Sequence, residues 1–209
     1  MNLSKMWITR KDFKILPVTK EQAVDFLMTF YRLEVKSRCR DYIETKSIKR
    51  SVSQVASFLT GEKHKFGLLL CGNVGNGKTT MLKCISKLYS YLATEGYVGF
   101  DGKDCFEFVQ AKELALKILT DSVSYNYLKS CRKLIIDDLG EDATEIPLYG
   151  INYTPIKDVI LERYENGLVT IISSNLNSSQ IKEKYHDERL SDRMREMFDV
   201  VPFEDKSFR

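Results

Sequence analysis

The sequence predicts a three-layer α/β fold, in which a parallel β-sheet is covered by helices on both faces. Three observations predict it. Apolar runs at 66–71, 134–136 and 168–172 have the length and composition of strands buried on both sides. Segments with apolar residues at helical spacing lie between these runs. This alternation of strand and helix is typical of a parallel sheet.

The segment 72–79 follows the first apolar run and has the complete phosphate-loop pattern G-x-x-x-x-G-K-[ST]. Its glycines allow the backbone to fold around an anion, with the loop N–H groups and the positive end of the next helix facing the phosphates. In such a loop Lys78 reaches the β- and γ-phosphates and the Thr79 hydroxyl binds Mg²⁺. We therefore predict a nucleoside triphosphate site. Its binding residues are Gly72, Asn73, Val74, Gly75, Asn76, Gly77, Lys78, Thr79 and Thr80.

Composition limits the classes of protein that fit. The chain has 209 residues, 43% hydrophobic and 29% charged, which allows one sizeable core and a smaller appendage. A net charge of +3 makes no global basic field, so nucleic-acid binding would need a local patch. The cysteines have no C-x-x-C spacing, which supports neither a disulfide framework nor a zinc site. No run approaches a membrane span, and residues 1–5 do not begin a signal peptide, so we expect a cytoplasmic protein with no membrane partner.

The N-terminal part is basic and is expected to differ from the rest. Residues 1–18 interleave basic and aromatic side chains, which could contact nucleic acid or a partner protein, or could form an arm that packs on the body. The cluster 36–40 contains three basic residues and is expected to be a solvated face. We place a soft boundary near residue 45. Residues 1–45 are then an N-terminal arm and helix, a candidate partner or nucleic-acid contact, and 46–209 are the nucleotide-binding core.

Two helices are predicted before the loop. Thr19 with Gln22 three residues later is a capping-box start, and Gly61 is the expected C-cap of the second helix. The apolar faces consist of Ala23, Leu27, Phe30 and Tyr31 in the first helix and of Ile48, Val52, Val55 and Leu59 in the second.

The region after the loop helix is less regular. Residues 106–109 predict a short strand and 111–119 a helix. The stretch 122–130 is ambiguous, and it holds Tyr125 and Tyr127 near a lysine. Such tyrosines can stack on bases, although packing is their more frequent role.

Two carboxylates follow the second apolar run. Asp137 and Asp138 would lie at the carboxyl edge of the sheet, where ligands bind in open α/β folds. We expect Asp137 to hold Mg²⁺, directly or through water, and Asp138 to orient or deprotonate an attacking water. Any strand can end in an acidic turn, but this pair lies downstream of a full phosphate loop and is its expected partner.

The third run ends in Asn175, which a parallel sheet would place at the same edge as Asp137. Residues 139–152 form a long polar connection before it, and Thr154 with Pro155 predicts the start of a helix. An amide at this edge can bond both the γ-phosphate and the attacking water without repelling the phosphate. A plain turn-forming role for the asparagine remains open.

The segment 187–198 predicts the last helix, and 199–203 a closing strand at the sheet edge. Arg189 and Arg193 lie four residues apart, on a face away from the apolar stripe. We therefore expect the guanidinium of Arg193 to point outward. The inward stripe consists of Leu190, Met194 and Met197.

Taken together, these motifs resemble the DnaC/IstB group of AAA+ ATPases, which covers bacterial replicative-helicase loaders and transposition ATPases. The resemblance spans roughly 46–209 and implies a P-loop AAA+ core with a small helical N-terminal extension. The matching stretches are LLLCGNVGNGKTT, LIIDDLG, YGINYTPIKDVILERYENGLVTIISSNL and ERLSDRMREMF.

The resemblance implies a role for each matching residue. Asp137 and Asp138 match the second nucleotide motif, and Asn175 matches the polar sensor. Arg193 matches the arginine finger offered to the ATP of a neighbouring subunit, with Arg189 as the weaker candidate. Together with Lys78, the residues implied in catalysis are then Asp138, Asn175 and Arg193, with ATP and Mg²⁺ as the bound groups.

One departure from many AAA+ proteins is expected. The sequence stops before a C-terminal helical lid with its second sensor arginine. The resemblance then implies a site open on one side, which self-association into a ring or filament would complete.

Three functions fit these motifs. The first is an ATP-driven helicase loader of DNA replication that binds the replicative helicase and single-stranded DNA as an oligomer. The second is an IstB-like ATPase that binds duplex DNA and recruits a transposase. The third, a small-molecule nucleotide kinase, would need an acceptor pocket and an arginine-rich lid.

Overall fold

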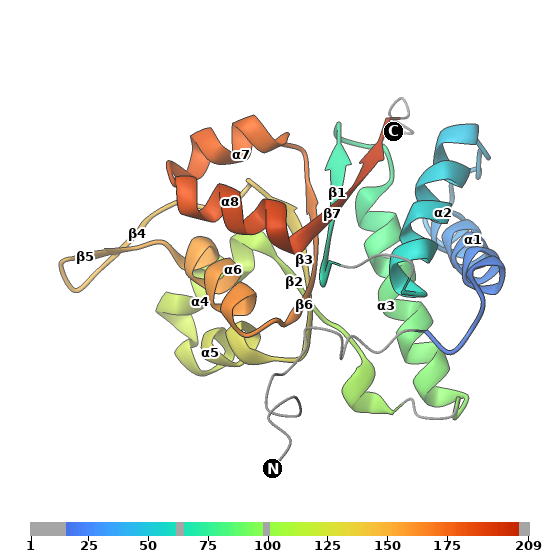
Figure 1. Ribbon diagram of the computed structural model, residues 1–209, viewed down its shortest axis with the longest axis horizontal. Helices are drawn as coiled ribbons and strands as arrows, with labels where there is room; N and C mark the ends of the chain where they lie inside the picture. The colour runs from blue at the N-terminus through green and yellow to red at the C-terminus, as the bar shows by residue number, and fades with distance from the viewer. Residues whose placement is uncertain (1–15, 62–64, 98–100, 205–209) are drawn as a thin grey trace, which may run out of the picture.

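The computed structural model describes residues 16–61, 65–97 and 101–204. Its centre is a five-stranded sheet with the order β2-β3-β6-β1-β7, in which every neighbouring pair is parallel (Figure 1). The chain therefore visits the strands out of sequence order, and β6 lies between β1 and β3. The strands are β1 (Gly67–Gly72), β2 (Glu107–Gln110), β3 (Lys133–Leu139), β6 (Val169–Ser174) and β7 (Phe198–Phe203).

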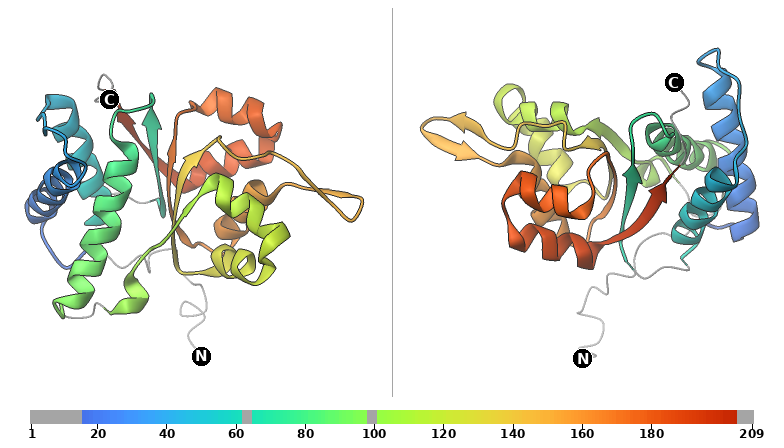
Figure 2. Two further views of the ribbon diagram at one scale, coloured as in Figure 1. Left: turned by 180° about the vertical axis from the view of Figure 1, so that it is seen from behind. Right: turned by 90° about the horizontal axis from the view of Figure 1, so that it is seen from above.

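Helices cover both faces of this sheet, which confirms the predicted three-layer P-loop AAA+ core with an N-terminal helical part (Figures 1 and 2). One layer consists of α1 (Lys20–Lys36), α2 (Lys46–Leu59) and α3 (Lys78–Thr94). The other consists of α4 (Ala111–Thr120), α5 (Ser122–Ser130), α6 (Pro155–Glu165), α7 (Ser178–Tyr185) and α8 (Glu188–Met197). A short 3₁₀ turn, η2 (Gly102–Asp104), precedes β2.

The central strands supply both hydrophobic layers by alternation. In β1, Leu68 and Leu70 face the cluster beneath α1, α2 and α3, whereas Leu69 faces the cluster beneath α4 to α8. Ile171 and Ile172 in β6 divide between the layers in the same way. Successive strand residues point to opposite faces, so a strand covered on both sides must be apolar throughout. This explains the continuous apolar runs in the sequence.

The N-terminal helices belong to the packed body. Thr19 and Gln22 form the predicted capping box of α1, and the predicted stripe of α2 is buried. Helix α1 packs on α2 and α3, and its buried residues share one cluster with β1 and β6. The boundary near residue 45 stays a prediction. Among residues 1–18, which carry the predicted basic and aromatic contacts, 1–15 lie outside the described residues.

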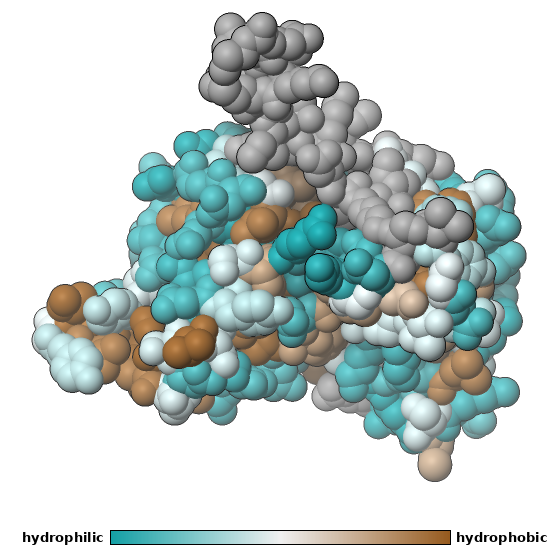
Figure 3. Space-filling view, turned by 90° about the horizontal axis from the view of Figure 1, so that it is seen from below, coloured by the Kyte–Doolittle hydropathy of each residue, from teal (hydrophilic) through white to brown (hydrophobic). Residues whose placement is uncertain are grey.

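The structure defines two segments that the sequence left ambiguous or predicted as a plain connection. The ambiguous stretch 122–130 is helix α5, in which Tyr125 is buried and donates its hydroxyl to the carbonyl of Pro155, the first residue of α6. The connection 139–152 contains part of a hairpin of β4 (Ile146–Leu148) and β5 (Ile151–Tyr153), whose turn residues Tyr149 and Gly150 both have positive φ. Such turns match the twist of paired strands. The hairpin projects from the body and carries apolar side chains (Figures 1 and 3).

The sequence analysis does not predict helix α7, because this helix has only eight residues, too few for a clear helical period. Its start signal is nevertheless present, since Asn177 and Gln180 form a capping box. Within the described part of the chain no helix is long and apolar enough to cross a membrane. All five cysteines are free thiols.

A buried arginine joins the helical layer to the sheet. Arg163 of α6 is fully buried and donates to Thr170 Oγ1 at 2.8 Å and to the carbonyls of Val169 and Cys131 at 2.7 and 2.8 Å. Burial lowers the pKa of Arg163 to about 10, so the guanidinium remains charged at neutral pH. Removing it would leave buried carbonyls without donors.

Arg163→Ala is therefore expected to lower the free energy of unfolding by about 3 kcal/mol or more, from unpaired carbonyls and the cavity left behind. Arg195→Ala is the control, because the Arg195 side chain is 73% exposed and pairs only with Asp192 three residues earlier. Arg195→Ala should change the free energy of unfolding by no more than about 0.5 kcal/mol. Urea denaturation measures both. Equal stability of the two variants would contradict the role of Arg163.

Candidate nucleotide-binding site

Two glycines allow close approaches that shape the phosphate loop. Gly72 has φ +153°, and a Cβ there would lie 2.1 Å from the carbonyl oxygen of Phe203 in β7. Gly77 has φ +97°, and a Cβ there would lie 1.9 Å from the hydroxyl of Tyr31 in α1. Any larger residue would displace one of these neighbours. The loop is thus enclosed by the last strand on one side and by the first helix on the other.

Lys78, the first residue of α3, has its ammonium group inside the loop. Its Nζ donates to the carbonyls of Gly72 and Asn73 at 2.6 and 2.8 Å, and to Oδ1 of Asn76 and Asn175 at 3.2 and 2.7 Å. Lys78 is only 4% exposed. These amide and carbonyl oxygens carry no formal charge, so they hold the ammonium without cancelling its charge. The arrangement suits the capture of an anion.

The strand order brings the second and third motifs to the same place. Because β6 lies between β1 and β3, Asn175, just after β6, sits between the loop and the carboxylates that end β3. The sequence predicts Asn175 at the same edge as Asp137, and its contact with Lys78 agrees with that position.

Asp137 and Thr79 form the candidate metal site. Thr79 Oγ1 donates to Asp137 Oδ1 at 3.2 Å, and Ser173 of β6 donates to the same carboxylate oxygen. Mg²⁺ prefers oxygen ligands at about 2.0–2.1 Å in octahedral geometry, which places neighbouring ligand oxygens about 3 Å apart. The two side chains therefore fit a shared Mg²⁺, and their role as ligands stays a prediction. Ser173 was missed, because nothing in a β-branched strand sequence marks one serine as a second contact.

Asp138 lines the cavity over the loop, whereas Asp137 is buried. It has φ +57°, and the pairing register of β3 with β6 shifts between Ile136 and Leu139. Its backbone N–H donates to Ser173 Oγ at 2.9 Å. A left-handed conformation costs a non-glycine residue about 1–2 kcal/mol. At this irregularity of β3, Asp137 is buried and Asp138 reaches the cavity; their roles stay predictions.

The cavity has a volume of about 390 Å³ and is lined from both parts of the chain. The core side consists of Val74–Thr80, Asp138, Glu141 and Asn175. The N-terminal side consists of Tyr31, Val35, Arg38, Arg40, Asp41, Tyr42, Ile43 and Ile48. Residues 36–40 are all exposed, as the solvated-face interpretation predicts, and Arg38 and Arg40 in addition line this cavity. Sequence alone gave no reason for the α1–α2 connection to fold over the loop.

The fold is similar to solved structures of three replication proteins. The crystal structure of the DnaC helicase loader matches with a TM-score of 0.56 and 21% identity, over 78% of this chain and 93% of that one. DnaI matches with a TM-score of 0.56 and 19% identity, over 78% of this chain and 87% of that one. AMPPCP-bound DnaA from Aquifex aeolicus matches with a TM-score of 0.54 and 17% identity, over 79% of this chain and 50% of that one.

The chain has a DnaC-like AAA+ fold. No family model and no curated protein matches the sequence. At these identities the likeness concerns the fold. Within this AAA+ fold the phosphate loop, the two carboxylates and Asn175, the predicted sensor, are gathered at one edge of the sheet.

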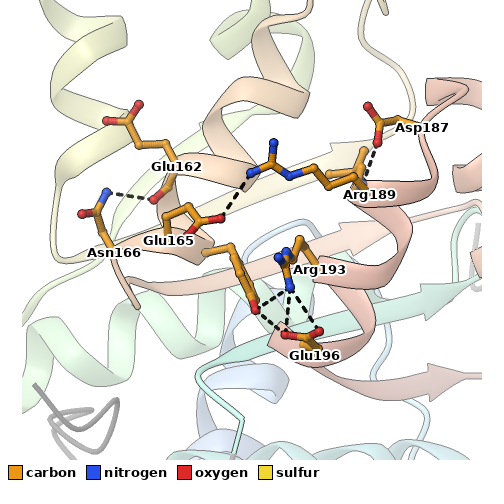
Figure 4. A network of polar contacts seen from close by, with 9 residues as sticks. Glu162, Glu165, Asn166, Asp187, Arg189, Arg193 and Glu196 are labelled. Carbon is orange, nitrogen blue, oxygen red and sulfur yellow. Dashed lines mark hydrogen bonds and ion pairs between the residues drawn. The ribbon is translucent and has the colours of Figure 1, made fainter. Parts of the chain in front are cut away.

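The two candidate finger arginines lie on α8 beside α6 (Figure 4), and neither lines the cavity. Arg193 lies over the ring of Tyr164 at 4.7 Å from its centroid, and donates to Tyr164 Oη at 3.1 Å and to Glu196 Oε1 at 3.3 Å. The predicted outward orientation is therefore wrong, because α6 packs on α8 and Tyr164 holds the guanidinium. The Arg193 side chain is 34% exposed, whereas that of Arg189 is 65% exposed and meets Glu165 at 3.4 Å.

The assembled residues can bind and activate a triphosphate. The loop N–H groups and Lys78 would hold the β- and γ-phosphates, and Thr79 with Asp137 would hold Mg²⁺, which supplies charge neutralisation there. Asp138 reaches the cavity, where it can orient a water or accept its proton. Asn175 can bond the γ-phosphate as an uncharged group.

Lys78→Ala is expected to abolish ATP binding and to leave the fold intact, since the ammonium serves the loop rather than a hydrophobic cluster. Titration with a fluorescent ATP analogue measures the affinity, and circular dichroism checks folding. Lys87→Ala is the control, because Lys87 lies on the same helix and does not line the cavity. Unchanged affinity in folded Lys78→Ala would contradict the assignment of 72–79 as the triphosphate-binding loop.

Asp138→Asn should bind ATP with Mg²⁺ but hydrolyse it at least about a hundredfold more slowly, because the buried Asp137 remains while the water-orienting carboxylate is lost. Phosphate release under single-turnover conditions separates turnover from binding. Lost binding with normal turnover of the bound fraction would exchange the roles of the two carboxylates.

Proposed function

We propose that this protein is an ATP-binding and ATP-hydrolysing helicase loader of DNA replication. In this role it acts as an oligomer on the replicative helicase and on single-stranded DNA. The observation that carries the enzymatic part is the contact of Lys78 with Asn175, beside the pair formed by Thr79 and Asp137. Lys78, Thr79 and Asn175 line one cavity, with the buried Asp137 bonded to Thr79, and this supports their roles as phosphate-binding cation, metal ligands and sensor.

The partner part of the proposal draws on fold likeness. The similar structures include a protein whose name is DnaC helicase loader and a DnaA bound to AMPPCP, an analogue of ATP. The DnaC likeness covers 93% of that solved chain, so the shared unit is more than an isolated nucleotide motif. An IstB-like transposition ATPase shares this core and remains the alternative. A nucleotide kinase is less favoured, because the late arginines pair with carboxylates and a tyrosine on neighbouring helices.

A pull-down with the replicative helicase of the same cell tests the proposal. We expect capture of the helicase to depend on ATP and to be lost in Lys78→Ala. The same preparation, offered single-stranded and duplex DNA, should retain the single strand in the presence of ATP. ATP hydrolysis without helicase capture, together with a preference for duplex DNA, would favour the transposition ATPase. Absence of ATP binding would contradict both.

An arginine finger acting between subunits is part of the proposal. Arg193→Ala should keep ATP binding and lose about a thousandfold or more in turnover, since such arginines stabilise charge on the transferred phosphate. For this the guanidinium has to leave Tyr164 and Glu196 when subunits meet.

Mixing Arg193→Ala with Lys78→Ala should restore part of the ATPase activity, because each variant supplies the group that the other lacks at a shared interface. A mixture as inactive as its components, where wild type assembles, would contradict action between subunits. Full activity of Arg193→Ala alone would transfer the role to the more exposed Arg189.

A further inference from the structure

We propose that Arg38, in the turn after α1, is a second phosphate-binding cation of the nucleotide site and contacts the α-phosphate of ATP and ADP. The inference rests on the proposed function, since it requires a nucleotide in the cavity. It assigns a ligand contact to a residue outside the phosphate loop and outside the predicted core.

Arg38 stands at the edge of the first turn of α3. It lines the cavity, and its Nη1 lies 3.4 Å from Oγ1 of Thr80. The N–H groups of a first helical turn have no partner within the helix and face any anion bound there. A guanidinium beside Thr80 is therefore within reach of the same anion, and guanidinium groups bind phosphate oxygens well.

The order of groups along the cavity indicates which phosphate Arg38 contacts. Lys78 contacts Asn175 at the sheet edge, next to the carboxylates, and that end suits the γ-phosphate. The α1–α2 segment that carries Arg38 also supplies the apolar lining, which suits a nucleobase. These apolar residues are Tyr31, Val35, Tyr42, Ile43 and Ile48. Arg38 and Thr80 thus lie where the phosphate chain joins the nucleoside.

A buried carboxylate holds Arg38 in place. Glu34 of α1 is 5% exposed and accepts from Arg38 Nη2 at 2.7 Å and from Lys87 Nζ at 2.5 Å, with Lys83 at 3.8 Å. Burial alone would raise the pKa of Glu34, but the hydrogen bonds from Lys87 and Arg38 outweigh it and hold the pKa below its ordinary value. One carboxylate thus faces three cations. Positive charge remains available for a phosphate.

The two terminal nitrogens of the Arg38 guanidinium have different partners. Nη2 is directed to Glu34 while Nη1 is directed to Thr80, so one side chain spans the anchor and the cavity. A lysine carries all its donors on one nitrogen and lacks this fork, so it spans two separated groups less well. Arg38→Lys should therefore retain only part of the affinity that the guanidinium contributes.

The test compares Arg38→Ala with Lys87→Ala in calorimetric titrations with ATP and with ADP, both with Mg²⁺. Lys87 binds the same carboxylate but does not line the cavity, so it controls for weakened packing around Glu34. We expect Arg38→Ala to bind both nucleotides about tenfold more weakly, the usual scale for one charge-assisted hydrogen bond. Lys87→Ala should stay within about twofold of wild type, and Arg38→Lys should lie between the two.

Other results of these titrations would each contradict one part of the proposal. Equal losses in Arg38→Ala and Lys87→Ala would mean that Arg38 acts only through packing, and a loss for ATP alone would contradict the α-phosphate contact. Unchanged affinity in Arg38→Ala, with binding abolished by Lys78→Ala, would overturn this inference and leave the proposed function standing. Wild-type protein that binds neither nucleotide would overturn both. Thermal melts without nucleotide identify a variant that fails to fold, in which case the Arg38→Lys titration decides.

Discussion

The enclosed ammonium group of Lys78 is the interaction on which the site depends. A lysine that is 4% exposed needs oxygens on several sides, and these come from the loop itself and from Asn175 after β6. This contact is available only because β6 lies between β1 and β3. The parallel sheet therefore does more than carry the loop. Its strand order places the amide of Asn175 against Lys78 and the buried carboxylate of Asp137 against the neighbouring Thr79.

The N-terminal helices complete this site rather than standing apart from it. The hydroxyl of Tyr31 approaches Gly77 so closely that no side chain fits there, and the α1–α2 connection forms one side of the cavity. Glu34 links this connection to α3 through Lys87 and Arg38. Arg38 is therefore the residue through which this connection meets both Glu34 and the cavity.

The sequence predicted the parts of the molecule that follow local rules. The phosphate loop, the apolar strands and the capping box at Thr19 were found because each has a short pattern with a physical cause. Asn175 was placed correctly by the rule that parallel strands end at one edge. The orientation of Arg193 and the cavity contacts of Arg38 were missed, since both depend on which helices pack together. Such long-range contacts leave no local pattern.

The central claim is that the phosphate loop and the α1–α2 connection hold the nucleotide together. Amide hydrogen exchange with and without a non-hydrolysable ATP analogue and Mg²⁺ tests it directly, because exchange reports local opening segment by segment. The account predicts slower exchange in 72–80 and also in 37–45, with the projecting hairpin at 146–153 unchanged. Protection confined to 72–80 would contradict the joint site.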